Sequence, residues 1–211
     1  MKASLFLPIL CLGSFVGTSA QGQAIANVSP AIEAPLTESG QVTVGGKAAS
    51  YLIRHLPVSS FPSLPAKVVE ALSQKGCTIP QTYQAHRPEN VIHGSFERPG
   101  SSDWAVLCSA HRTVSLLVFF ESAAETAEGQ PIVLASVAEA KRLQAYPGSA
   151  VLGFDWGIDP VSPETVHQSQ NGMANRPAKL DHDALADSVI DHATTYHFYA
   201  RNAWTVLPMP E

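Results

Sequence analysis

Acidic and histidine side chains are concentrated near the carboxyl end of the chain: Asp181, His182, Asp183, Asp187, Asp191 and His192. If residues 183–191 form a helix, the three later aspartates share one face, and a cation would relieve their repulsion. Carboxylate oxygens and imidazole nitrogens bind divalent metals, so Asp181, His182, Asp183 and His192 are candidate ligands. A metal-assisted hydrolase using this cluster is one hypothesis. We favour the alternative in which Asp181 or Asp183 caps a short helix and the other side chains face water.

Two other segments are candidates for a ligand-binding surface. His86 and Arg87 precede a proline, and a proline-bounded polar loop presents its side chains rigidly. Asp155 and Trp156 combine a carboxylate with an aromatic platform, as sites for glycans or peptides often do. For Trp156 we favour the alternative of a core residue. The HExxH and Gly-x-Ser-x-Gly patterns are absent from the sequence, so neither a zincin nor an α/β-hydrolase is indicated.

The first twenty residues have the pattern of a secretory signal peptide. Lys2 precedes an apolar run from Leu5 to Val16, and small residues follow up to Ala20. The apolar run is shorter than the roughly 20 residues that a membrane span needs, and no later segment approaches that length. We therefore expect residues 1–20 to be a cleaved leader, the protein to be exported to the periplasm or secreted, and no stable membrane span to be present.

The cysteines support a disulfide prediction. Of the three in the chain, Cys11 lies in the expected leader, which leaves Cys77 and Cys108. Two cysteines in an exported chain are usually paired, so we expect a disulfide between them. Two separate buried thiols are the alternative.

Patterns of apolar residues and turn signals predict the elements that position these candidates. The predicted strands cover residues 51–56, 90–96, 104–108, 114–120, 131–135 and 150–156, and 195–199 with 204–207 form a C-terminal hairpin. A helix is expected after Ser63 as N-cap, ending at Gly76, and another after Ser162 as N-cap. Residues 137–145 are a further candidate helix.

The domain prediction follows from these elements. Residues 21–46 are rich in polar residues, Pro and Gly without periodicity, which predicts a flexible N-terminal arm. Residues 47–211 are then expected to form a single α+β domain with an antiparallel sheet core, two or three short helices and the C-terminal hairpin.

Charge narrows the choice of partner. The chain of 211 residues has 13 Lys and Arg against 18 Asp and Glu, a net charge of -5. Such a chain has no basic excess for a phosphate backbone, so we expect no nucleic-acid partner. We expect a non-enzymatic binding domain of the cell envelope or extracellular space, with a protein, glycan or small molecule as its ligand. It would need no cofactor, apart from the candidate divalent cation.

Several segments of the chain resemble segments of other proteins. The chain resembles a group of uncharacterised exported bacterial proteins with a Cys-x-Ile-Pro-Gln segment, an Asp-Trp-Ala-Val-Leu-Cys strand and a late Asp-His-Asp, here starting at Cys77, Asp103 and Asp181. This resemblance implies a periplasmic or secreted protein and no particular activity. Locally, residues 94–107 are similar to one FG-GAP repeat, whose acidic loop binds calcium. The loop here retains Glu97 and Asp103, with Arg98 and Pro99 at other positions of the loop.

Overall fold

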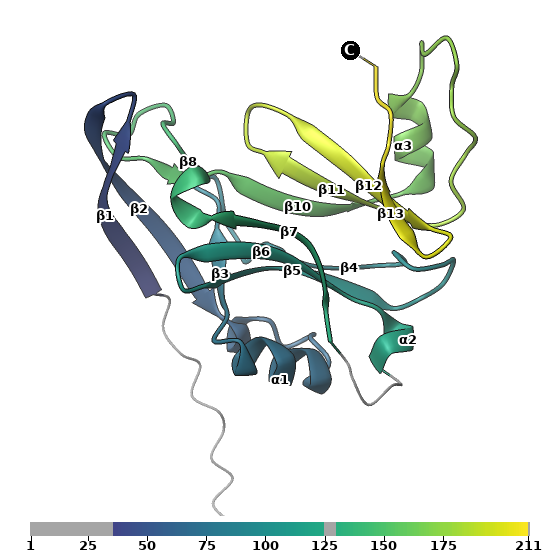
Figure 1. The fold of residues 1–211 in the computed structure, drawn as a ribbon, viewed down its shortest axis with the longest axis horizontal. Helices are drawn as coiled ribbons and strands as arrows, with labels where there is room; N and C mark the ends of the chain where they lie inside the picture. Colours follow the sequence, from purple (N-terminus) through teal and green to yellow (C-terminus); the bar gives the residue numbers. More distant parts are fainter. Residues whose placement is uncertain (1–35, 125–129, 211) are drawn as a thin grey trace, which may run out of the picture. The chain divides into compact units, whose positions relative to one another are not determined.

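The computed structural model describes residues 36–124 and 130–210, and its largest element is a seven-stranded antiparallel sheet (Figure 1). The strands are ordered β1-β2-β3-β5-β6-β7, and β4 pairs with β5 off this path. Their bounds are β1 Leu36–Val44, β2 Lys47–Pro57, β3 Thr78–Gln81, β4 Val91–Gly94, β5 Asp103–Ala110, β6 Thr113–Phe119 and β7 Ile132–Ala138.

The last third of the chain forms a second sheet, with four antiparallel strands. Its strands are β10 Trp156–Val161, β11 Ala184–Val189, β12 Thr194–Ala200 and β13 Ala203–Val206. A small sheet pairs β8 (Leu143–Gln144) with β9 (Gly153–Phe154). The helical segments are α1 Ala66–Gln74, α2 Glu121–Ala124, α3 Pro163–Ser169, and the 3-10 turns η1 Val58–Ser60 and η2 Glu139–Lys141.

The central strands β5 and β6 are covered on both faces. Leu107 and Leu116 point into a core shared with the four-stranded sheet, where they pack with Trp156 and Leu185. The alternate side chains of the same strands, Val106 and Leu117 among them, point into a second core under α1. In Figure 1, α1 accordingly lies on one side of the large sheet and β10–β13 on the other. The apolar run at residues 114–120 is thus a central strand, as its composition predicts.

The expected α+β class is wrong, because the described residues fold into three antiparallel sheets with only short helices at their periphery. Residues 137–145, expected to be helical, instead contain the end of β7, η2 and β8. Residues 183–191 contain β11. In both segments, pairing with a neighbouring strand overrides local helix propensity, since strand formation depends on packing against neighbours. The C-terminal hairpin is confirmed as β12 and β13.

The expected arm is corrected at its carboxyl end. Residues 36–44 form β1, which pairs along its whole length with β2. A tight turn at Gly45 and Gly46, both with positive φ, connects the two strands. The rest of the expected arm, residues 21–35, and the expected leader, residues 1–20, lie outside the described residues.

The predictions for the helix starts had different outcomes. Ser162 caps α3, since its Oγ accepts a hydrogen bond from the Thr165 N–H at 3.2 Å. Ser63 does not cap α1: the N-cap position is Pro65, which offers no side-chain acceptor. The proline ring supplies a fixed φ at the helix start instead.

The predicted disulfide is confirmed between Cys77 and Cys108, whose Cα atoms lie 5.1 Å apart. Cys77 follows the Gly76 turn that ends α1, and Cys108 lies in β5. The bond therefore ties the end of α1 to a central strand of the sheet.

A buried amide side chain links the two larger sheets. Asn90 is 1% exposed, and its Nδ2 donates to the carbonyl oxygens of Pro80 in β3 at 2.7 Å and Trp156 in β10 at 3.1 Å. Its Oδ1 accepts from the N–H of Ile158 at 3.2 Å. The backbone of Asn90 has φ of 68°, a left-handed conformation that asparagine tolerates better than most residues.

We predict that Asn90→Ala lowers the free energy of unfolding by about 3 kcal/mol or more, because buried polar groups of both sheets lose their partner. Asn202→Ala is the matched control, since Asn202 has a φ of 62° in the exposed β12–β13 turn. It should cost only about 1 kcal/mol, the backbone contribution. Urea unfolding of both variants measures the difference, and equal losses would contradict the role of the Asn90 amide.

Candidate functional site

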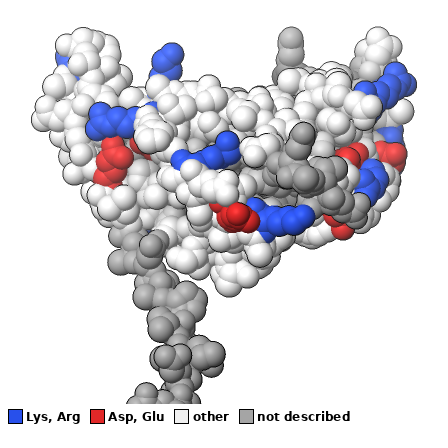
Figure 2. Space-filling model, turned by 60° about the horizontal axis from the view of Figure 1, so that its bottom comes forward, with Lys and Arg blue, Asp and Glu red and all other residues white. Residues whose placement is uncertain are grey.

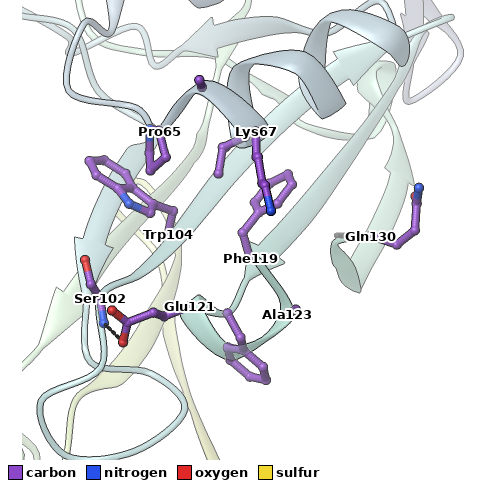
Figure 3. A pocket seen from close by; sticks show the side chains of 11 residues that line it. Pro65, Lys67, Ser102, Trp104, Phe119, Glu121, Ala123 and Gln130 are labelled. Atoms are coloured by element: carbon purple, nitrogen blue, oxygen red, sulfur yellow. Dashed lines mark hydrogen bonds between the residues drawn. The ribbon is translucent and has the colours of Figure 1, made fainter. Parts of the chain in front are cut away.

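An apolar pocket of about 300 Å³ lies between α1, the ends of β5 and β6, and α2 (Figure 3). Aromatic and aliphatic side chains form most of its lining, with a few polar groups. The lining residues are Pro65, Ala66, Lys67, Val68, Ser102, Trp104, Phe119, Phe120, Glu121, Ala123 and Gln130. Its volume is at the lower end of the range of small-molecule sites.

The register of the central hairpin places the aromatic side chains of the pocket. Trp104 in β5 is directly opposite Phe119 in β6, so both side chains stand on the same face of the sheet. This face is covered by α1, whose Val68 is buried against the same apolar cluster. Figure 3 shows Trp104 and Phe119 between Pro65 and Lys67 on one side and Glu121 and Ala123 on the other.

Hydrogen bonds hold the polar edge of the pocket in place. The Ser102 N–H donates to the Glu121 carboxylate at 3.2 Å, and Ser102 Oγ lies 2.8 Å from His93 Nε2. The His93 ring in turn contacts the Trp104 indole, with ring centroids 4.9 Å apart. The fully buried Asp103 accepts hydrogen bonds from the N–H groups of Glu97 and Glu121 at 2.7 and 2.8 Å. The edge is therefore positioned before any ligand arrives.

Asp103 and Glu97 are also the two carboxylates in the FG-GAP-like loop. Asp103 accepts the two backbone hydrogen bonds just described. Glu97 pairs with Arg98 and accepts a hydrogen bond from the Ser122 hydroxyl at 2.6 Å. Both carboxylates therefore already have partners within the protein.

A second polar cluster lies at the other end of the central hairpin. One ligand-type atom each of Glu38, His55 and Glu139 lies within 4.8 Å of the other two, the one such group of three in residues 36–124 and 130–210. His55 Nε2 is 3.0 Å from Glu139 Oε1, and both side chains are at least 95% buried. Burial raises the pKa of Glu139, but hydrogen bonds from His55 and Ser109 outweigh it and leave the pKa below its ordinary value.

The candidate metal ligands near the carboxyl end do not form such a group. His182 has both ring nitrogens engaged, Nδ1 with Asp181 at 2.6 Å and Nε2 with the Tyr199 carbonyl at 2.8 Å. Asp183 accepts from the Ser95 N–H at 2.9 Å. His192 is exposed at the β11–β12 turn. Because residues 184–189 form the strand β11 rather than a helix, the aspartate row of the metal hypothesis is not formed, and the favoured prediction that Asp181 or Asp183 caps a helix is wrong.

The four residues predicted to form a ligand surface lie in different environments: two are exposed and two are buried. His86 and Arg87 are exposed on the loop after β3. Trp156 is fully buried, donates from Nε1 to Asp187 at 2.6 Å, and lies 4.2 Å under the Arg142 guanidinium. The hypothesis that Trp156 forms an exposed aromatic platform is therefore wrong, and the alternative of a core residue is confirmed. Asp155 is also buried, and its Oδ1 has no hydrogen-bond partner among the described residues.

The comparisons with known proteins give no match: no family model, curated protein or solved structure resembles the chain. Within residues 36–124 and 130–210, every helix is too short or too polar to cross a lipid bilayer.

We predict that Asp155→Asn raises the free energy of unfolding by about 1 kcal/mol at neutral pH. Burial raises the pKa of Asp155, although Arg142 and His192 oppose this. When the pKa of a carboxyl is higher in the folded than in the unfolded state, the free energy of unfolding falls as the pH rises from the unfolded-state pKa to the folded-state pKa. The advantage of the neutral amide should therefore shrink at about pH 3, where the carboxyl is protonated in both states.

Urea unfolding at the two pH values tests this prediction for Asp155. Glu70→Gln, on the exposed face of α1, provides the matched carboxyl-to-amide control. It should change stability little at either pH. A pH-independent effect of Asp155→Asn would contradict the argument.

Proposed function

We propose that the protein is an exported, non-enzymatic binding domain that takes a small aromatic ligand in the pocket beneath α1. The observation that carries this proposal is the preformed apolar pocket of about 300 Å³ lined by Trp104 and Phe119. Ligand sites combine such an apolar lining with a small number of placed polar groups.

The lining favours a ring-bearing ligand with one polar substituent. Trp104 and Phe119 offer aromatic surfaces, and aromatic pairs gain more than their buried area alone provides. Glu121 stands at the edge with 45% of its side chain exposed, and its carboxylate can accept a hydrogen bond from a ligand N–H or O–H. The volume is suited to one or two fused rings rather than to an oligosaccharide.

Export and the exclusion of polyanions are supported by separate observations. The Cys77–Cys108 disulfide fits an oxidising compartment, as does the leader-like sequence of residues 1–20. Figure 2 shows Lys and Arg side chains intermixed with Asp and Glu on the face drawn, separated by uncharged surface. A polyanionic partner would require a continuous basic face.

A metal-assisted hydrolase using the Asp181–His192 cluster is the competing hypothesis. Among the described residues, no three of its candidate ligands bring their ligand atoms within 4.8 Å of one another. We therefore favour the binding domain.

We predict that the purified protein binds indole, one per chain, with a dissociation constant of about 0.1–1 mM, as expected for so small a ligand. Trp104→Leu should weaken binding about tenfold because it removes an aromatic wall. Isothermal titration calorimetry measures both constants.

Tyr146→Leu is the matched control for this experiment. Tyr146 also stacks on an aromatic side chain, Tyr83, with ring centroids 4.4 Å apart, but it does not line the pocket. Its loss should leave indole binding unchanged. The proposal fails if the wild-type protein does not bind indole, or if the two variants weaken binding equally while circular dichroism shows both to be folded.

A further inference from the structure

The cluster of Glu38, His55 and Glu139 draws its three side chains from separate segments of the chain. Glu38 lies in β1, His55 in β2 and Glu139 in η2, directly after β7. In the β1–β2 pairing Glu38 lies opposite Ile53, and Ile53 is two residues before His55 on the same strand. The backbone of Glu139 is fixed by its N–H, which donates to the Arg112 carbonyl in the β5–β6 turn at 2.9 Å. Strand pairing thus assembles two carboxylates and an imidazole.

Space for an ion and bound water adjoins the two carboxylates of the cluster, whereas His55 does not line it. Glu38 and Glu139 both line a cavity of about 160 Å³, together with Tyr51, Arg112 and other residues of the surrounding strands. A water molecule occupies about 30 Å³ of liquid volume. The cavity can therefore hold a cation that keeps water in part of its coordination sphere.

Each carboxylate is oriented by a hydroxyl group outside the cluster. Tyr51 donates to Glu38 at 2.9 Å, and Ser109 donates to Glu139 at 2.7 Å. The Tyr51 ring crosses β1 at Gly40, where a Cβ would lie 2.8 Å from Tyr51 Cε1. The missing side chain at Gly40 allows this hydroxyl to reach Glu38. Hydrogen bonds of this kind orient ligating carboxylates in metal sites.

The charges around the cluster leave room for a cation. The two carboxylates have one guanidinium beside them, that of Arg112, at 3.5 Å from Glu38. The Arg112 side chain is 80% exposed, so it can move into solvent when a cation binds. Glu139 is buried and paired with His55, whereas the side chain of Glu38 is 29% exposed.

We propose that Glu38, His55 and Glu139 form a binding site for a divalent transition-metal ion, with Zn²⁺ as the best-fitting case. Carboxylate oxygen and imidazole nitrogen are both ligand types of Zn²⁺, and three protein ligands leave the fourth tetrahedral position for water. Imidazole in the set favours Zn²⁺ over the all-oxygen chemistry of Ca²⁺. The site shares no residue with the pocket beneath α1, so the two proposals stand or fall separately.

Titration of the purified, chelator-treated protein with ZnCl₂ tests this site. We expect one Zn²⁺ per chain with a dissociation constant of about 10 μM or lower, and a higher melting temperature with Zn²⁺, because an ion that binds only the folded state stabilises it. Glu38→Gln should weaken binding at least tenfold and abolish the thermal shift. Tyr51→Phe, which removes only the hydroxyl that orients Glu38, should weaken it severalfold.

His111→Asn is the matched control, since it removes an exposed imidazole next to Arg112 while asparagine tolerates the positive φ of 51° at this position. It should leave Zn²⁺ binding unchanged. The proposal is overturned if the wild-type protein does not bind Zn²⁺, if folded Glu38→Gln binds it as tightly as wild type, or if CaCl₂ binds more tightly than ZnCl₂. In the first two cases the cluster is only an internal His–Glu pair.

Discussion

The buried amide of Asn90 is a directional link between the two larger sheets, beside the hydrogen bonds between Ser95 and Asp183. It satisfies carbonyl groups of β3 and β10 and a backbone N–H of β10. Apolar packing between sheets is non-directional and tolerates sliding, whereas a buried amide is satisfied in only one arrangement. Together with the Ser95–Asp183 hydrogen bonds, Asn90 therefore helps to fix the registry within which the shared core, which includes Trp156, is packed.

The two candidate sites lie at opposite ends of the central β5–β6 hairpin. Trp104 and Phe119 stand at one end of the β5–β6 ladder, and Ser109 and the turn containing Arg112 stand at the other. The five residue steps from Trp104 to Ser109 correspond to about 17 Å of strand. Most of the middle of the hairpin is buried on both faces, and both candidate sites use residues at its ends.

Local signals predicted the elements better than they predicted the sites. The disulfide, the Ser162 cap, the central strand at residues 114–120 and the terminal hairpin follow from composition and spacing alone. Residues 183–191 became a strand because β10 and β12 flank it, which no local pattern reveals. Glu38, His55 and Glu139 are far apart in sequence, and Glu38 lies in a segment with the composition of a loop. Their association depends on strand pairing, as does that of Trp104 with Phe119.

The disulfide joins the two walls of the pocket beneath α1. One wall includes Pro65 and Val68, at the start of α1, and the chain reaches Cys77 just after the end of this helix. The other wall includes Trp104, which lies in the same strand as Cys108. In the oxidised chain a covalent bond limits how far these walls can separate. A newly synthesised, still reduced chain lacks this limit. In that chain the two walls are held only by the apolar packing of α1 on the sheet, so oxidation restricts how far the pocket can open.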